Sequence, residues 1–192
     1  MSTALFIVDV QNDFTEGGAL GVTGGDAVAV AISRHLAARA GDYDLIVASR
    51  DWHDADNANG GHFAADPDFV DTWPAHCVAG TAGAEYDPGF VTDAVTHHVK
   101  KGQGEPAYSL FEGVTDDGVT VAHLLDDHGV LEVDVVGIAT DYCVRASALD
   151  AIAHGRRVRI FTDLVAGVAP TSTEAALAEL AHAGAVLDES GA

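Results

Sequence analysis

The residue best suited to nucleophilic chemistry is a cysteine placed where a strand turns into a helix. Cys143 lies within residues 137–145, GIATDYCVR. The valine-rich residues 133–136 predict a buried strand of a parallel sheet, and the residues after Cys143 predict a helix. Thr140 or Asp141 can cap that helix. Backbone N–H groups and the helix dipole in the first turn favour a thiolate, although a cysteine at a helix start is more often simple packing.

Four potential metal ligands fall within one long stretch rich in Gly, Pro and Asp. They are Asp51, His53, His62 and His76. Zinc or iron accepts such a mixture of carboxylate oxygen and imidazole nitrogen, with positions left for water or substrate. Chance is the competing explanation, because the chain has 10 histidines. The concentration in one loop favours a metal site, and we interpret Cys77, next to His76, as a small buried hydrophobic residue.

Two further ionisable residues stand at predicted strand ends. Asp9 ends the apolar residues 4–8, and a buried carboxylate is costly without a cationic partner. The chain has only two lysines, Lys100 and Lys101. We expect Lys101 to be the partner of Asp9, against the simpler interpretation that it is solvated like its neighbour.

The elements that must position these residues alternate along the chain. Strands are predicted at 4–10, 45–48, near 99–102, at 133–136, 158–161 and 184–187, and helices at 25–40, 119–128, 146–155 and 172–183. This alternation predicts an α/β fold with three αβα layers and a mainly parallel, doubly wound sheet of about six strands. Such sheets bind ligands at the carboxyl ends of their strands. Asp9, Asp51 with His53, Lys101 and Cys143 end the first four strands, so Cys143 becomes a catalytic candidate.

Three aromatic residues lie outside the periodic segments. Phe14, Trp73 and Tyr108 fall in predicted loops. Aromatic side chains at such positions suit the walls of a flat pocket, although exposed aromatics also pack down to cover a core. We predict that these three line a pocket for a flat substrate.

Composition limits the classes of partner. A chain of 192 residues fits one domain spanning residues 1–192, and no apolar run reaches bilayer length. A net charge of −21 opposes binding to nucleic acid or to anionic membranes. The chain begins directly with a strand and has 2 cysteines, too few for a disulfide framework, so we expect the cytoplasm. The sequence is compatible with a homo-oligomer.

Several motifs, in order, resemble those of nicotinamidases within the isochorismatase-like cysteine hydrolases. They are VDVQNDF at 8–14 with Gly17 and Gly18, RDWH at 50–53, GHF at 61–63, WPAHCV at 73–78 with Gly80 and Thr81, KG at 101–102, YSLFEG at 108–113 and GIATDYCVR at 137–145. Each motif alone is weak. Together they span roughly residues 4–155.

The resemblance implies a role for each matched residue. Asp9, Lys101 and Cys143 would form a catalytic triad, and Asp51, His53, His62 and His76 would bind one divalent metal ion. We expect zinc first, with iron or manganese as alternatives. The Ile138–Ala139 peptide would be cis, and backbone N–H groups of Ala139 and Cys143 would stabilise an oxyanion.

The activity implied by the resemblance is hydrolysis of nicotinamide to nicotinate and ammonia in NAD salvage. Asp9 would take the proton of Cys143, and the thiolate would attack the carboxamide carbon to form a thioester. A small molecule, nicotinamide, is therefore the expected partner.

Three other interpretations remain open from the sequence. A superfamily amidase acting on carbamoyl or ureido substrates would need the triad without a metal. An isochorismatase proper would cleave a vinyl ether and would not need the thiol of Cys143. A metal- or redox-sensing module without catalysis would leave Asp9, Lys101 and Cys143 without purpose. The intact ligand positions favour the nicotinamidase interpretation.

Overall fold

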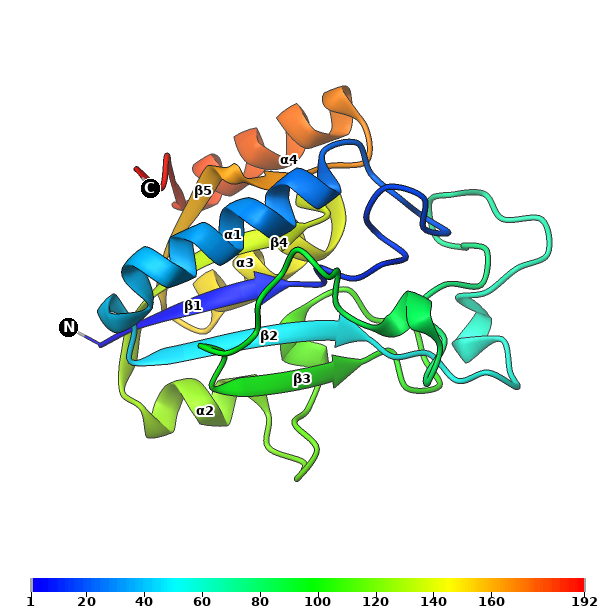
Figure 1. Cartoon of the computed structure of the whole chain (residues 1–192), viewed down its shortest axis with the longest axis horizontal. Coiled ribbons are helices and arrows are strands. Elements are labelled where there is room, and N and C mark those ends of the chain that lie inside the picture. The colour runs from blue at the N-terminus through cyan, green and yellow to red at the C-terminus, as the bar shows by residue number, and fades with distance from the viewer. Residues whose placement is uncertain (1, 192) are drawn as a thin grey trace.

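A parallel sheet runs through the centre of the structure, a computed structural model that describes residues 2–191 (Figure 1). The strands are β1 (Ser2–Val8), β2 (Leu45–Asp51), β3 (His97–Lys101), β4 (Val130–Ile138), β5 (Arg157–Ala166) and β6 (Val186–Asp188). The helices are α1 (Gly25–Arg39), α2 (Val121–Asp127), α3 (Arg145–Ala153) and α4 (Pro170–Ala183). The spatial order is β3-β2-β1-β4-β5-β6, and every pairing is parallel. The predicted α/β fold class is confirmed.

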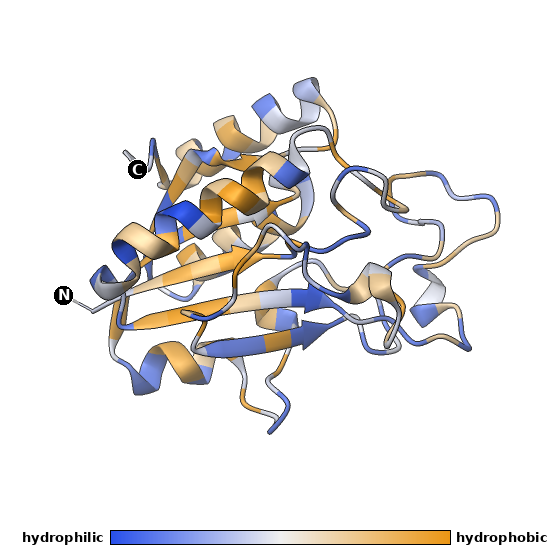
Figure 2. Cartoon of the chain, in the orientation of Figure 1, coloured by the Kyte–Doolittle hydropathy of each residue, from blue (hydrophilic) through white to orange (hydrophobic). Residues whose placement is uncertain are grey.

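Two apolar layers hold the helices against the sheet. Successive side chains of a strand point to opposite faces, and β1 is apolar at nearly every position, so both of its faces must be covered. Leu5 and Ile7 pack with α1, whereas Phe6 and Val8 pack with residues of α2, α3 and α4. Hydropathy follows this arrangement: β1 is hydrophobic, and the carboxyl ends of β2 and β3 are hydrophilic (Figure 2).

The strand order creates a crevice at one end of the sheet. The chain moves outward from β1 to β2 and β3, then returns to β4 on the other side of β1. The loops beyond the carboxyl ends of β1 and β4 therefore diverge, which is where doubly wound sheets bind ligands. The long connection between β2 and β3 lies at this end, and both chain ends lie at the opposite end (Figure 1). The helical elements of the β2–β3 connection are two short 3₁₀ turns, η2 (Asn59–Gly61) and η3 (Ala82–Ala84).

Element boundaries differ from the predicted ones where polar residues continue a strand or end it early. The first strand stops at Val8 rather than residue 10, because Asp9 adopts a left-handed conformation with φ of 47°. The strand predicted at 158–161 continues to Ala166. Within residues 2–191, no helix has both the length and the apolar character needed to cross a membrane.

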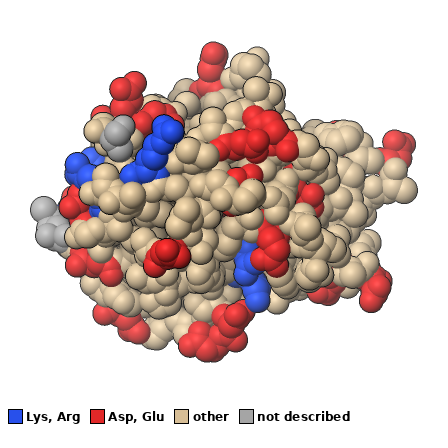
Figure 3. All heavy atoms as spheres, in the orientation of Figure 1, with Lys and Arg blue, Asp and Glu red and all other residues tan. Residues whose placement is uncertain are grey.

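The surface carries the excess of acidic residues that the composition requires. Aspartate and glutamate side chains are spread over the face in Figure 3, and lysine and arginine side chains are few. Some basic side chains are paired with acidic ones, as in the ion pairs of Arg50 with Glu85 and Lys100 with Asp116. No broad basic surface is visible on the face shown in Figure 3.

Gly137 allows β4 to approach β1 just before the crevice. It has φ of 117°, and an added Cβ would lie 2.1 Å from the backbone oxygen of Val8. We expect Gly137→Ala to lower Tm strongly, because left-handed strain of about 1–3 kcal/mol adds to this clash, and each kcal/mol lowers Tm by roughly 2–4 °C.

Gly155→Ala is the matched control in a thermal melt. Gly155 also has positive φ, 76°, but no atom lies within 4 Å of its added Cβ. Equal melting temperatures for the two variants would contradict the importance of the close approach.

Candidate active site

Four buried ionisable side chains meet at the carboxyl ends of the central strands. The Nζ atom of Lys101 lies 2.8 Å from Oδ2 of Asp9 and 3.6 Å from Sγ of Cys143, and it also donates to Oδ1 of Asp51. Asp9 and Lys101 are at most 1% exposed, and Cys143 is 6% exposed. The sequence predicted this convergence from strand ends alone, and the structure brings the three residues into contact.

The register of β3 separates the two lysines. Neighbouring residues of a strand point to opposite faces, so only one lysine can reach the centre. Lys101 is buried, whereas Lys100 pairs with exposed Asp116 at 2.8 Å and lies over the ring of Trp52.

The nucleophile turn places Cys143 through a π-type turn rather than through a capped helix start. The peptide between Ile138 and Ala139 is cis, and residues 140–144 form the turn, with the Val144 N–H bonded to the Ala139 carbonyl at 3.1 Å. The cap of α3, Val144, is itself helical and has no side-chain cap. The prediction that Thr140 or Asp141 caps this helix is therefore wrong, because the helix continues directly from the π turn.

Asp141 instead fastens the segment before α4. Its carboxylate accepts hydrogen bonds from the Val168 N–H at 3.0 Å, the Ala169 N–H at 3.3 Å and the Ser172 hydroxyl at 2.5 Å. The residue two positions before Cys143 thereby holds the loop between β5 and α4 against the nucleophile turn. No sequence pattern predicts this contact, because its partners are about 30 residues away.

The electrostatics of the buried group favour proton exchange between Asp9 and Cys143. Burial raises the pKa of the Cys143 thiol well above its usual value, and the Lys101 ammonium only partly opposes this. Burial likewise raises the pKa of Asp9 despite the nearby Lys101. Burial also opposes the charge of Asp51, but Lys101, His53 and His76 hold the pKa of that carboxyl well below its usual range. Asp9 is thus the carboxyl better suited to carry a proton.

The Lys101 charge is kept by its anionic neighbours. Burial alone would lower the pKa of Lys101, yet Asp51, Asp9 and Cys143 together raise it well above the usual lysine value. The ammonium therefore stays protonated while a proton moves between its neighbours.

Three imidazoles and the outer side of Asp51 form a second cluster beside the first. Ligand atoms of His53, His62 and His76 all lie within 4.8 Å of one another. Oδ2 of Asp51 is 3.6 Å from Nε2 of His53 and 3.7 Å from Nε2 of His76. All four residues are buried. Asp51 therefore faces Lys101 with one oxygen and the imidazoles with the other.

The hydrogen bonds of this cluster fit a divalent cation. Nδ1 of His53 bonds to the Gly102 carbonyl and Nδ1 of His76 to the Pro74 carbonyl, each at 2.8 Å. These bonds direct Nε2 of both rings inward, as in metal sites. Nε2 of His53 is buried without a hydrogen-bond partner. Burial lowers the pKa of His62 to about 4, with His53 and His76 adding to the effect, so its ring is neutral and can bind a metal.

Gly102 is a part of this cluster whose role the sequence did not specify. It has φ of 76°, and an added Cβ would lie 2.4 Å from Cε1 of His53. Glycine is needed both for the backbone conformation and for the imidazole that lies against it.

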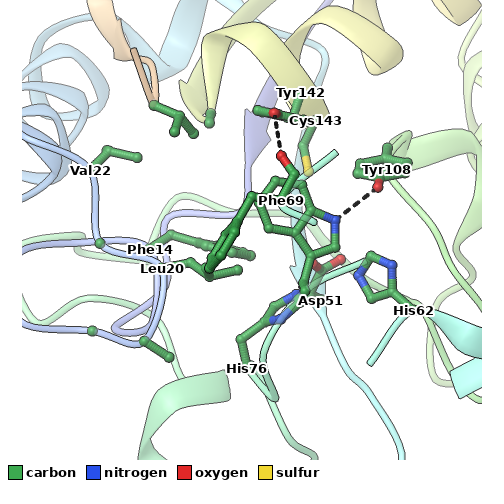
Figure 4. A pocket seen from close by; sticks show the side chains of 16 residues that line it. Phe14, Leu20, Val22, Asp51, His62, Phe69, His76, Tyr108, Tyr142 and Cys143 are labelled. Atoms are coloured by element: carbon green, nitrogen blue, oxygen red, sulfur yellow. Dashed lines mark hydrogen bonds and ion pairs between the residues drawn. The ribbon is translucent and has the colours of Figure 1, made fainter. Parts of the chain in front are cut away.

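A cavity of about 340 Å³ opens onto both clusters (Figure 4). Phe14, Trp73 and Tyr108 line it, as the sequence predicted for a flat pocket. Further wall residues were not predicted, namely Leu20, Val22, Phe69, Tyr142 and Val168. Leu20, Val22, Phe69 and Val168 come from irregular loops whose path has no periodic signal, whereas the position of Tyr142 next to Cys143 could have indicated its role.

The aromatic wall is held together by specific contacts. Nε1 of Trp73 donates to the Tyr108 hydroxyl at 3.0 Å. The rings of Trp73 and Tyr142 pack edge-to-face, with their centroids 5.1 Å apart. Cys143, Asp51, His62 and His76 line the same cavity. A flat ring can therefore lie between aromatic walls while its polar substituents face the thiol and the imidazoles.

Comparison with known families identifies the chain. The family model for the isochorismatase domain matches residues 3–190. The chain belongs to the isochorismatase family. This finding confirms the resemblance that the ordered motifs indicated.

The relatives extend over nearly the whole chain. Nicotinamidase/pyrazinamidase of Mycobacterium tuberculosis is 51% identical over 177 residues, which cover 92% of this chain and 93% of that protein. The crystal structure of pyrazinamidase of Pyrococcus horikoshii in complex with zinc matches with a TM-score of 0.83 at 39% identity, covering 98% of this chain and 99% of that one. PnC1 from L. infantum in complex with nicotinate gives a TM-score of 0.82 at 36% identity, covering 98% and 93%.

Removal of the buried ammonium tests the electrostatics of this isochorismatase-family site. In Lys101→Met the thiol of Cys143 loses its cationic neighbour, so its pKa rises and the thiolate fraction at pH 7 falls. We expect alkylation of Cys143 to slow by roughly tenfold for each unit of pKa. Peptide mass spectrometry after timed iodoacetamide treatment measures this rate at Cys143 separately from Cys77.

Lys100→Met is the matched control and should leave the alkylation rate unchanged, since that side chain lies on the surface. An equal response of the two variants would show that the register of β3 does not control the nucleophile.

Proposed function

We propose that this chain hydrolyses nicotinamide to nicotinate and ammonia through a thioester on Cys143. The observation that carries the proposal is the contact of the Lys101 ammonium with Asp9, Asp51 and Cys143 at the end of an aromatic cavity. The relatives support it, because the Mycobacterium tuberculosis protein is a nicotinamidase/pyrazinamidase and the L. infantum protein was crystallised with nicotinate.

In the first half of the reaction, Asp9 accepts the thiol proton and the thiolate of Cys143 attacks the carboxamide carbon. The carbonyl oxygen becomes an oxyanion, and the N–H groups of Ala139 and Cys143 stabilise it, each contributing about 3–4 kcal/mol in other hydrolases. Asp9 then protonates the leaving nitrogen, so that the C–N bond breaks, ammonia departs and a thioester remains. Lys101 keeps its charge and holds the carboxylate beside the sulfur.

In the second half, water replaces ammonia. Asp9 takes a proton from the water molecule, whose oxygen attacks the thioester carbon. The C–S bond breaks, and the proton on Asp9 returns to the sulfur of Cys143. The product forms as nicotinic acid, which loses its remaining proton to the solvent and leaves as nicotinate, and the site regains its starting protonation. Both halves use the same acid–base residue.

We further propose that Asp51, His53, His62 and His76 bind one divalent metal ion. Zinc is our first expectation, supported by the zinc complex of the Pyrococcus horikoshii relative and by the inward-facing imidazoles of His53 and His76. When bound, the ion supplies a Lewis acid that can hold the ring nitrogen of the substrate. Asp51 then connects the metal site with Lys101.

The cellular setting is also a proposal. Nicotinate from nicotinamide would feed NAD salvage. Both cysteines are free and buried, which suits the reducing cytoplasm. The proposed partner is a small amide. The mass of the protein in solution would show whether the chain forms a homo-oligomer.

Ammonia release from nicotinamide by the purified protein tests the activity. Cys143→Ala should abolish turnover while the protein keeps its melting temperature, because no other thiol among residues 2–191 lines the cavity. Cys77→Ala should cost at most a few-fold, since that thiol is fully buried and its pKa is raised by burial. Comparable losses in both variants would contradict the division of roles. Turnover of a ureido substrate but not nicotinamide would favour the metal-free amidase alternative.

Elemental analysis tests the metal site. We expect one metal ion per chain, lower activity after chelation, and loss of the ion in His53→Ala and in His76→Ala. His97→Ala is a suitable control, because His97 bonds to Thr96 at the far end of β3. A full complement of metal in the double variant of His53 and His76 would refute the ligand assignment.

A further inference from the structure

The backbone pairing of β1 with β2 stops before it reaches the two acidic residues of the site. The last pair joins Ile7 to Ala48. Asp9 lies beyond it in a left-handed conformation that turns the chain out of the ladder. Asp51 pairs with Lys101 of β3 on its other side. The backbone groups of Asp51 that face β1 therefore need other partners, because buried N–H and C=O groups are rarely left unpaired.

The side chain of Gln11 supplies these partners. Its Nε2 donates to the Asp51 carbonyl at 2.9 Å, and its Oε1 accepts from the Asp51 N–H at 2.8 Å. Nε2 also donates to the Ala84 carbonyl at 2.9 Å, and the side chain is fully buried. An amide carries donors and an acceptor in one plane, which neither a carboxylate nor a thioether does. Gln11 thus binds Asp51 as a neighbouring strand would.

Ser49, in β2, binds Asp9 through its side-chain hydroxyl. The Ser49 hydroxyl accepts from the Asp9 N–H at 3.2 Å and donates to Oδ1 of Asp9 at 2.6 Å. Ser49 is also fully buried. The segment that follows β1 and the strand β2 therefore each contribute one polar side chain that binds the acidic residue of the other.

The two acidic residues face different groups. The carboxylate of Asp9 pairs with Lys101, which contacts the nucleophile. The carboxylate of Asp51 also bonds to Lys101, but its second oxygen faces His53 and His76. A displaced Asp51 would disturb the imidazole cluster directly, whereas Asp9 is connected to that cluster only through Lys101.

We propose that Gln11 and Ser49 are positioning residues with separate duties. Gln11 fixes Asp51 and thereby the affinity and geometry of the metal site, while Ser49 fixes Asp9 and thereby the proton transfer. The inference rests on the proposed function for the roles of the two carboxylates. The hydrogen bonds of Gln11 with Asp51 and those of Ser49 with Asp9 both extend the contact between β1 and β2, but they serve different parts of the site.

The test compares Gln11→Met, which keeps the side-chain length but removes its hydrogen bonds, with Ser49→Ala. Zinc affinity is measured by competition with a chromogenic chelator, and metal geometry by the visible spectrum of the cobalt(II)-loaded protein. We expect Gln11→Met to bind zinc about 10–100-fold more weakly and to change the cobalt spectrum, as loss of an outer-shell partner does elsewhere. Its kcat should fall as well.

Ser49→Ala should keep the zinc affinity and the cobalt spectrum of the unchanged protein while kcat falls by about tenfold or more. Ser49→Thr retains the hydroxyl and should recover most of this loss. Gln103→Met is the control for Gln11, because Gln103 is the only other glutamine and is exposed.

Equal weakening of zinc binding in Gln11→Met and Ser49→Ala would overturn the proposal, because both residues would then merely hold the strands together. Unchanged zinc affinity in a folded Gln11→Met variant would do the same. If that variant does not melt cooperatively, the zinc measurement on Gln11→Glu decides, since it keeps the shape and the acceptor but loses both donors. If the wild-type protein does not release ammonia from nicotinamide, the proposed function is refuted. The zinc and cobalt measurements would still decide the role of Gln11.

Discussion

The site depends on one buried positive charge. An ammonium group without water is tolerated only when anions and acceptors surround it, and Lys101 meets this condition through Asp9, Asp51 and Cys143. Its partners follow or end three other strands, β1, β2 and β4. The charge can therefore be accommodated only when four strands are in their correct register. The site is therefore complete only in the correctly paired sheet.

The doubly wound topology makes this convergence feasible. With β1 in the middle of the sheet, residues after β1, β2 and β4 reach a common point, and β3 contributes a long side chain from one strand further away. A shift of β3 by one residue would exchange Lys101 for Lys100 and place the wrong face inward. The apolar layers on both faces of β1 fix the register that the polar end requires.

The sequence predicted those features that depend on period and strand ends. The layered fold, the positions of Asp9, Lys101 and Cys143, and the grouping of ligand-type residues in one loop all follow from such patterns. The π turn, the contacts of Asp141 and the wall residues Phe69 and Val168 do not, because they depend on how irregular loops meet in space. Family resemblance supplied the cis peptide, for which composition and periodicity contain no signal.

The dipeptide Lys101–Gly102 has a consequence for how such a site can change during evolution. The Lys101 ammonium contacts Cys143, and the Gly102 carbonyl orients the imidazole of His53. A shift of this short segment would therefore damage both centres together. A descendant of this chain that lost metal binding but kept the thiol chemistry would therefore have to change residues outside this dipeptide. The wall residues Leu20, Val22 and Phe69 belong to neither cluster, so changes there can alter substrate preference without this constraint.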